Sequence, residues 1–502
     1  MTNEITNNVQ MRKIAFLFSM ILAVVSVQVA QADTAVPISV GDSTLELSNI
    51  ISRGLPVLCV NTVDSMELTC DYVSAPAGCM GKSIANATKV PGRLVIYQLL
   101  DGIDSVLYDS GEYEKNVSGM TIKIRGNTSA YGNKKPYKIK LQKKHDLLFR
   151  GDEETYKDKE WLLLKYDYLL VMAGFKVNEL LGLPWTPSMR FVNVIIDDEY
   201  KGVYMLCESV KYNPYCRIKV DKYAGFIFEC DPYWWNESVY VNSITAPSYN
   251  FTFKYPDDED ITPEQLEYIQ GVVTTYENSL STPDYPNYID VPSFAAWCLG
   301  HDIEGTQDSG GANRYYTKYD TTDTSKIFMP LLWDFDMAEH TSGAWSRSHT
   351  SHFEMLFNNP NRTFVDEFVG LWRKVEGTFN NKMSQYLMRF YSSDEGKALD
   401  ASLEVEGILW DYTYPKVSEH SHGRIGWYVS RVRWMNKKID AMNPIGDTNI
   451  DGTVSIADVT YLIDMLLGTA YYYRYAGDVN GDGNVTVADV TYLIDMLLNS
   501  AQ

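Results

Sequence analysis

The sequence predicts an α+β protein with two lobes, a β-rich N-terminal part and a helical C-terminal part, followed by a small all-α module. Three observations support this fold class. Short runs of β-branched and aromatic residues, separated by Gly, Pro and Asn, dominate residues 33 to about 260. From Thr262 onward, apolar residues recur with helical spacing. Near the C-terminus, one stretch of sequence is written twice.

Strands make up most of the first part. One longer apolar run, residues 169–181, has helical spacing and is followed by Gly182 and Pro184, which commonly end helices. The shorter runs are rich in the residues that favour strands. The strands expected on this basis are residues 55–62, 120–125, 137–141, 191–196, 203–207 and 226–230.

Helices dominate the second part. The predicted helices are residues 263–280, 291–299, 364–391, 398–411 and 424–442. Pro444 and Gly446 then mark a junction. Because the strands come first and the helices follow, we expect a two-lobed α+β domain. The expected organisation is a β-rich region over residues 33–115, a two-lobed domain over 116–443 and a terminal module over 444–502.

The start of the sequence has the pattern of a secretory signal peptide. Arg12 and Lys13 precede an apolar run over residues 14–27, and Ala30-Gln31-Ala32 forms a cleavage site of the small-x-small type. This run is shorter than the roughly 20 residues that span a bilayer. We therefore expect residues 1–32 to be removed, translation to start at Met11, and the protein to be secreted, extracellular or at the cell surface.

Composition and cysteine usage exclude several classes of protein. A net charge of −21 argues against nucleic-acid binding, which needs a basic face. The seven cysteines have no spacing typical of zinc ligands. After signal cleavage we expect no membrane span, because no later apolar run is long enough. Cys59, Cys70 and Cys79 lie close together in the sequence, and we expect one disulfide among them.

The repeated stretch near the C-terminus has the spacing of a calcium-binding loop. Both copies read D-x-N-x-D-G-x-V-x-x-A-D, beginning at Asp447 and Asp478, and both continue into the same string, DVTYLIDMLL. Calcium prefers six to eight oxygen ligands, and EF-hand loops supply them from positions 1, 3, 5, 7, 9 and 12, with glycine at position 6. The predicted calcium ligands are Asp447, Asn449, Asp451, Thr453 and Asp458 in the first loop and Asp478, Asn480, Asp482, Asn484 and Asp489 in the second.

An amphipathic helix is predicted after each loop, because Val459, Leu462, Ile463 and Leu466 and their repeated counterparts recur at helical spacing. Position 12 carries Asp in place of the Glu of an EF-hand, and no helix is evident before either loop. In these features the module resembles the type I dockerin family. The resemblance implies two calcium sites and, as partner, a cohesin domain on a scaffold protein.

Several blocks between about residues 55 and 440 resemble, in order, the spore-coat kinase (CotH) family. The matching blocks are residues 124–129, 134–140, 161–164, 181–187, 202–208, 225–231, 308–316 and 333–336. The resemblance implies an atypical, two-lobed kinase-like domain. One departure lies after residues 161–164, where residues 168–174 lack the basic and amide side chains that are usual in the family.

The candidate catalytic residues lie in the last two blocks. Asp308 and Asn313 have the spacing of the catalytic Asp and the metal-binding Asn in a protein-kinase catalytic loop. Asp334 and Phe335 resemble the start of a DFG motif, with Asp336 in place of glycine. The resemblance implies that Asp308 is the catalytic base and that Asn313 and Asp334 hold Mg²⁺. Asp336 is a candidate second metal ligand.

Basic residues on the early strands are the candidates for binding the phosphates of ATP. By the same resemblance these are Arg125, Lys138 and Lys140, with Glu208 and Glu229 as candidates that orient a basic group or a metal. The sequence contains no G-x-G-x-x-G loop and no Walker A motif. ATP binding is therefore expected from the family resemblance alone.

These features predict a secreted kinase-like protein that transfers a phosphoryl group from Mg²⁺–ATP to Ser, Thr or other hydroxyls of a protein or glycan. Its dockerin would attach it to a scaffold in a calcium-dependent manner. The first alternative is a non-catalytic, dockerin-bearing subunit. The second is a polysaccharide-degrading component of a cellulosome-like complex, in which Glu304, Asp308, Asp334 and Asp336 would be the candidate carboxylates.

Overall fold

The computed structural model describes residues 34–79, 81–165, 167–246, 248–307, 309, 313–340, 342–346, 351–442, 444–449, 451–470 and 474–500. The predicted signal peptide, residues 1–32, lies outside these ranges, and so does Asp308. No helix within the described ranges is both long enough and apolar enough to cross a membrane.

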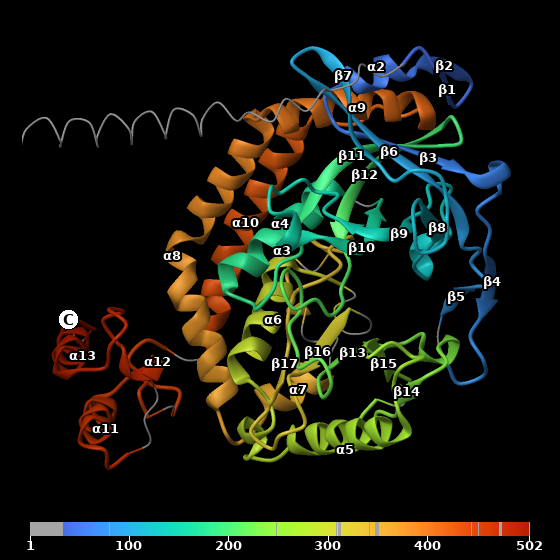
Figure 1. The fold of residues 1–502 in the computed structure, drawn as a ribbon. Coiled ribbons are helices and arrows are strands. Elements are labelled where there is room, and N and C mark those ends of the chain that lie inside the picture. Colours follow the sequence, from blue (N-terminus) through green and yellow to red (C-terminus); the bar gives the residue numbers. More distant parts are fainter. Residues whose placement is uncertain are drawn as a thin grey trace, which may run out of the picture.

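A ten-stranded sheet forms the first lobe (Figure 1). Its elements, with the short helix α2, are β1 (Pro37–Val40), β2 (Ser43–Glu46), α2 (Leu47–Ile51), β3 (Val57–Thr62), β6 (Val90–Leu100), β7 (Ile103–Asp109), β8 (Met120–Ile124), β9 (Tyr137–His145), β10 (Asp158–Leu164), β11 (Met189–Ile196) and β12 (Glu199–Glu208). Strand β10 pairs with both β9 and β12, which closes the sheet on itself. Because β6 pairs with β8, strands from both sides of residue 115 share this sheet.

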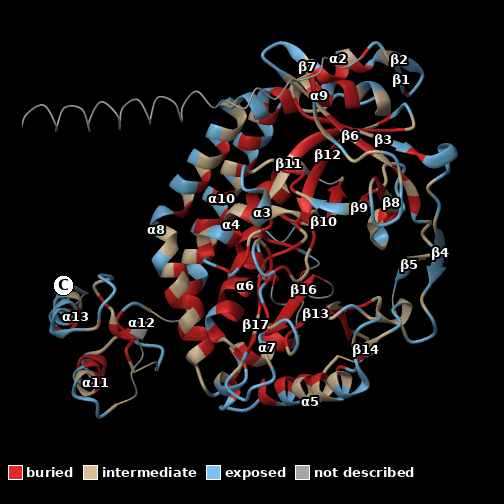
Figure 2. Ribbon diagram, viewed as in Figure 1, coloured by how far each residue is buried: buried red, intermediate tan, exposed pale blue. Residues whose placement is uncertain are grey.

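The strand pattern follows from where each side chain is buried. In β6 alternate residues are buried, and Val90, Leu94 and Ile96 face the interior of the closed sheet. Strands β11 and β12 are buried on both faces over most of their length, which explains their continuous apolar sequence. Figure 2 shows the resulting buried residues along the strands and along the helix faces that meet them.

A separate two-stranded hairpin lies beside the large sheet. It consists of β4 (Asp71–Ser74) and β5 (Lys82–Ala85), which pair in antiparallel register. Figure 1 shows it along one side of the molecule, reaching from the first lobe toward β14 and β15 of the second. We refer to it below as the β4–β5 hairpin.

The second lobe combines a five-stranded sheet with helices. The strand order is β14 (Tyr240–Val241), β15 (Asn250–Tyr255), β13 (Phe226–Asp231), β16 (Arg314–Lys318) and β17 (Ile327–Phe328). Strands β16 and β17 lie after Thr262, following two helices, and they were not among the strands predicted from the sequence. These strands are short, and β16 is buried by pairing with β13, so tertiary contact decides their conformation.

The predicted helices are present, with shifted ends. They are α4 (Tyr168–Leu181), α5 (Pro263–Ser279), α6 (Val291–Glu304), α8 (Thr363–Ser392), α9 (Asp394–Trp410) and α10 (Val417–Asp440), joined by the shorter α3 (Glu153–Tyr156) and α7 (Ser351–Phe357). Asp167 caps the start of α4, and Gly182 ends it with a φ of +72°. Helix α8 packs against α6 and α10, and Figure 1 shows α8 and α10 side by side along one flank of the molecule, with α9 beside the first lobe and α5 at the far end of the second.

The terminal module contains α11 (Ile456–Leu467), α12 (Arg474–Gly477) and α13 (Val487–Ser500). The helices predicted after the two loops are therefore confirmed. Val459, Leu462, Met465, Val479, Val490 and Leu493 form its small core. The seven cysteines of the chain are all described and all free, so the expected disulfide among Cys59, Cys70 and Cys79 is absent. Cys59 instead packs into the apolar cluster beside α2.

Candidate functional site

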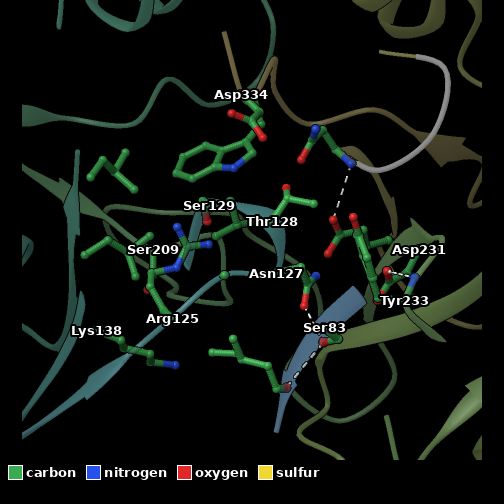
Figure 3. Close-up of a pocket in the computed structure, with 18 of the residues that line it drawn as sticks. Ser83, Arg125, Asn127, Thr128, Ser129, Lys138, Ser209, Asp231, Tyr233 and Asp334 are labelled. Atoms are coloured by element: carbon green, nitrogen blue, oxygen red, sulfur yellow. Dashed lines mark hydrogen bonds between the residues drawn. The ribbon is translucent and has the colours of Figure 1, made fainter. Parts of the chain in front are cut away.

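A cavity of about 680 Å³ lies where the two sheets face each other. Its walls come from β5, β8 with the loop that follows it, β9, β10 and α4 on one side, and from β13, β15 and the segment 333–336 on the other. Figure 3 shows Arg125, Asp231 and Asp334 converging on this space from different sides. A cavity lined by both lobes and by charges of both signs is the first candidate for a ligand site.

Two polar residues of the cavity have unusual backbone conformations. Asp334 follows a buried apolar segment that includes Leu331 and Leu332, and its φ is +65°. Asn313 precedes β16 with a φ of +72°. Left-handed conformations cost energy in residues other than glycine, and they concentrate at functional sites. Both side chains line the cavity, so the structure brings these two predicted metal ligands to one place.

Asp336 supplies the clearest sign that a cation fits this side of the cavity. Its Oδ1 atom is buried and accepts no hydrogen bond from any group in the described ranges. Burial raises the pKa of its carboxyl, although Asp334 and Lys165 oppose this shift. A buried carboxylate oxygen without a hydrogen bond is costly, and carboxylate and amide oxygens are the donors that Mg²⁺ prefers. Asp334, Asp336 and Asn313 therefore fit a Mg²⁺ ion.

A second charged group lies on β13 and β15. Lys254 Nζ is 2.9 Å from Glu229 Oε2, and Thr252 Oγ1 donates to Asp231 Oδ2 at 3.1 Å. Burial and the charge of Glu229 raise the pKa of Asp231 to about 7, against the effect of Lys254. The backbone N–H of Asn313 donates to Glu229 Oε1 at 3.4 Å, so this group also holds the candidate metal ligand in place.

The opposite wall carries basic side chains. Arg125 directly follows β8 and points into the cavity (Figure 3). Lys138, on β9, also lines it and pairs with Glu160 at 2.8 Å. Lys123 is the third cation of this wall, and burial together with Lys138 and Lys89 lowers its pKa. Clustered cations opposite hard oxygen ligands are suited to a metal-bound phosphate.

The loop after β8 lines one end of the cavity, and a hydrogen bond from the β4–β5 hairpin fixes this loop. Ser83 Oγ donates to Asn127 Oδ1 at 2.6 Å in this loop, and Asn236 Nδ2 of the second lobe donates to Ser83 Oγ at 3.0 Å (Figure 3). Gly126 has a φ of +87°, and a Cβ there would lie 2.1 Å from Ser129 Oγ. Ser83, which is 1% exposed, therefore links the loop to both lobes.

Replacing Ser83 by alanine should lower the free energy of unfolding by about 1–3 kcal/mol. The change leaves Asn127 and Asn236 each without one buried partner, and it frees the loop above the cavity. Chemical denaturation of the full chain measures the effect. The matched control is Ser74→Ala on β4, where the side chain is exposed. Equal losses in the two variants would contradict this role of Ser83.

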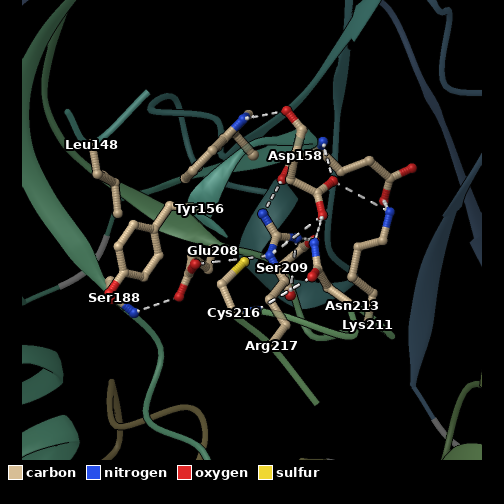
Figure 4. A network of polar contacts seen from close by, with 12 residues as sticks. Leu148, Tyr156, Asp158, Ser188, Glu208, Ser209, Lys211, Asn213, Cys216 and Arg217 are labelled. Atoms are coloured by element: carbon tan, nitrogen blue, oxygen red, sulfur yellow. Dashed lines mark hydrogen bonds and ion pairs between the residues drawn. The ribbon is translucent and has the colours of Figure 1, made fainter. Parts of the chain in front are cut away.

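Two of the predicted phosphate-site residues lie elsewhere. Lys140 is outside the cavity lining and pairs with Glu160 at 3.4 Å. Glu208 is buried behind the cavity, where it pairs with Arg150 at 2.9 Å and accepts from the backbone N–H of Ser188 (Figure 4). Of the predicted residues, the structure gathers Arg125, Lys138, Glu229, Asn313, Asp334 and Asp336 around one cavity.

The departure noted in the sequence after residues 161–164 also has a structural counterpart. Val171 and Phe175 of α4 line the cavity. The part of the cavity wall formed by α4 is therefore apolar, which agrees with the lack of basic and amide side chains in residues 168–174. Asp231, Lys254 and Ser83 also line the cavity and were not predicted from the sequence. A signal existed for Asp231, because Glu229 and Asp231 alternate with apolar residues on a buried strand, where carboxylates need partners.

The two loops of the terminal module repeat the same hydrogen bonds. In the first, Asp447 Oδ2 accepts from Gly452 N at 2.9 Å and Asp458 Oδ1 from Asn449 N at 3.0 Å. In the second, Asp478 Oδ2 accepts from Gly483 N at 2.8 Å and Asp489 Oδ1 from Asn480 N at 3.1 Å. Gly452 and Gly483 have φ values of +90° and +89°, so only glycine suits position 6.

The loop oxygens fit calcium. Asp478 Oδ1 is buried and has no hydrogen-bond partner among the described groups. Burial, and then the charges of Asp458 and Asp451, raise the pKa of Asp447, although two backbone N–H groups oppose the shift. Within the described ranges, no three His, Cys, Asp or Glu side chains are already arranged to hold an ion.

The fold and the site thus define a two-lobed α+β protein with a cavity suited to a metal and a phosphate, joined to a duplicated loop–helix module. Residues 122–392, more than half of the chain, match the family described as CotH kinase protein. The chain therefore belongs to the CotH kinase protein family. Residues 445–498 match the dockerin type I domain. Among curated proteins, none matches the chain.

The match to the dockerin type I domain indicates what such modules generally bind and where they occur. Type I dockerin domains typically bind Ca²⁺ and pair with cohesin domains, and they occur in extracellular or cell-surface proteins. The chain is thus a dockerin-bearing protein of the CotH type. The predicted recognition of both families is confirmed, as is the α+β fold class with its terminal dockerin.

Proposed function

We propose that this protein is a secreted kinase-like enzyme that transfers the γ-phosphoryl group of Mg²⁺–ATP to Ser, Thr or other hydroxyls. One observation carries the proposal. Asn313, Asp334 and the partly unpartnered Asp336 face Arg125 and Lys138 across a single cavity between the lobes. Phosphoryl transfer depends mainly on positioning and on charge neutralisation, and this arrangement supplies both.

Each group has a role that its position supports. Asp334, Asp336 and Asn313 would hold Mg²⁺, which neutralises phosphate charge when bound. Arg125 and Lys138 pair with phosphate oxygens, and the loop fixed by Ser83 covers them. Asp308, which lies outside the described residues, remains the proposed base. The acceptor oxygen forms a bond to the γ-phosphorus, the bond to the bridging oxygen breaks, the hydroxyl proton passes to Asp308, and ADP leaves.

The terminal module has a separate role in this proposal. Its two loops bind calcium, and the calcium-loaded module binds a cohesin domain of a scaffold protein. Exposed apolar side chains on its helices support a protein partner, because Leu467 is 70% exposed and Leu498 is 64% exposed. The enzyme would then act on protein or glycan acceptors held near the scaffold.

Glu304, one of the carboxylates of the polysaccharide-degrading alternative, is fully buried. It pairs with Arg424 and accepts a hydrogen bond from Tyr428 at 2.8 Å, and it lies outside the cavity lining. This placement favours the kinase-like proposal, because a glycosidase carboxylate has to reach the sugar.

Calorimetric titration of the full chain with ATP, with and without Mg²⁺, tests the proposal. We expect saturable binding that requires the metal, followed by release of ADP when proteins or glycans bearing hydroxyl acceptors are added. ATP binding without ADP release would leave a nucleotide-binding but inactive domain. A folded chain that binds no ATP would reject the kinase proposal in favour of a non-catalytic, dockerin-bearing subunit.

A further inference from the structure

Residues 331–336, which we call the ligand segment, carry two of the proposed metal ligands and belong to no helix or strand. Asp334 and Asp336 line the cavity, whereas Leu332 and Phe335 of the same segment are fully buried. Because the ligand segment has no backbone ladder of its own, the contacts of its buried side chains must fix where the two carboxylates lie.

Phe335 occupies a socket on α4 that exists only because residue 174 is glycine. A Cβ atom at Gly174 would lie within 2.5 Å of three atoms of the Phe335 ring, which is closer than non-bonded carbon atoms can approach. The ring also meets Phe175 edge-on, with 6.1 Å between the ring centroids, and it stacks on His301 of α6 at 5.9 Å. The side chain is therefore enclosed by both helices.

A second glycine, Gly300 in α6, receives Leu332 in the same way. A Cβ atom there would lie within 2.9 Å of both terminal methyl carbons of Leu332. The backbone N–H of Leu332 also donates to Asn178 Oδ1 of α4 at 2.6 Å, and both residues are buried. The ligand segment is thus anchored at two points, one on either side of Asp334.

Glycine inside a helix needs a reason, because it lowers helix stability relative to alanine. Gly174 and Gly300 are buried, and neither has a left-handed backbone conformation. Other helical glycines, such as Gly271 in α5 and Gly377 in α8, have open space where a Cβ atom would lie. The close approach of the ligand segment accounts for the glycines of α4 and α6.

We propose that Gly174 and Gly300 are positioning residues for the metal side of the cavity. By admitting Phe335 and Leu332, they fix the ligand segment so that its two carboxylates face the cavity. Helices α4 and α6 thereby set the geometry of the proposed metal site through packing. The inference rests on the Mg²⁺–ATP binding proposed above.

Two substitutions test the positioning role in the full chain. Gly174→Ala places a methyl group where the Phe335 ring lies, and we expect it to weaken Mg²⁺-dependent ATP binding at least about 10-fold, the usual cost of disturbing the groups that orient metal ligands. Phe335→Ala empties the socket without a clash, and we expect a loss of similar size. In the double variant the methyl group has no ring to displace, so its affinity should stay within about twofold of that of Phe335→Ala.

Calorimetric titration with ATP at fixed Mg²⁺ gives the affinities, and thermal unfolding without ligand shows that each variant is folded. The matched control is Gly377→Ala, where the added methyl group meets open space and ATP affinity should stay unchanged. Gly300→Ala and Leu332→Ala form a second cycle with the same expectation.

Wild-type ATP affinity in a folded but less stable Gly174→Ala variant would reduce the socket to a structural role. Additive losses in the double variant would show that the glycine does not act through Phe335. Either result overturns the positioning role while ATP binding stands. A wild type that binds no ATP overturns the proposed function and, with it, the positioning role.

Discussion

Replacing Asp334 by asparagine is expected to weaken Mg²⁺-dependent ATP binding by at least about 100-fold, because metal sites depend steeply on each ligand and its surroundings. Asparagine is the informative choice here. Asp334 has a φ of +65°, a conformation that Asn tolerates better than other residues with side chains. The backbone should therefore stay in place, and the carboxylate charge alone is removed. Calorimetric titration with ATP at fixed Mg²⁺ measures the change.

The matched control for this prediction is Asp323→Asn. Asp323 is exposed and lies outside the cavity lining, so the same chemical change there should leave ATP affinity within about twofold of the wild type. Thermal unfolding of both variants shows whether the fold is intact. If Asp334→Asn binds Mg²⁺–ATP as tightly as the wild type, Asp334 is not a ligand of the metal, and the site assignment fails.

Removing calcium should unfold the terminal module while the CotH domain stays folded. Six buried side chains form the core of the module, which is too few for so small a domain to be stable alone. Calcium at about 1,000 times its dissociation constant contributes about 4 kcal/mol for each site. We therefore expect a chelator to abolish the helical signal of α11 and α13 and to remove the module's own thermal unfolding step.

Differential scanning calorimetry combined with circular dichroism measures this change in the full chain. The Asp451→Ala, Asp482→Ala double variant should behave in calcium as the wild type does in the chelator, because each substitution removes a position 5 ligand. The main transition of the CotH domain serves as the reference and should not move. A module that keeps its helices in the chelator would show that its apolar core is sufficient without metal.

Local sequence determined most of the secondary structure. Helix α4 ends at Gly182, which adopts a left-handed conformation, and Thr262 with Gln265 caps the start of α5. Signals of this kind act between neighbours in the chain, so they can be read without the fold. Strands β16 and β17 have no such signals, and their pairing with β13 and with each other decides them.

The calcium loops show the same distinction within one motif. Their ligands lie within twelve consecutive positions, so the spacing alone predicts the site. The difference between the loops is not visible in the sequence, because the two copies are nearly identical. Asp447 is 1% exposed and Asp478 is half-buried, and only the packing of the folded chain decides this difference.

For the candidate site, the blocks around Asn313, Asp334 and Arg125 were enough to predict the residue types of the proposed chemistry. Which of the predicted residues line one cavity depends on the fold. It put Arg125 and Lys138 on the cavity wall and withdrew Glu208 into an ion pair with Arg150. The physical reason is that a cavity between two lobes is built from strands distant in the chain, whose facing side chains depend on sheet register and lobe packing.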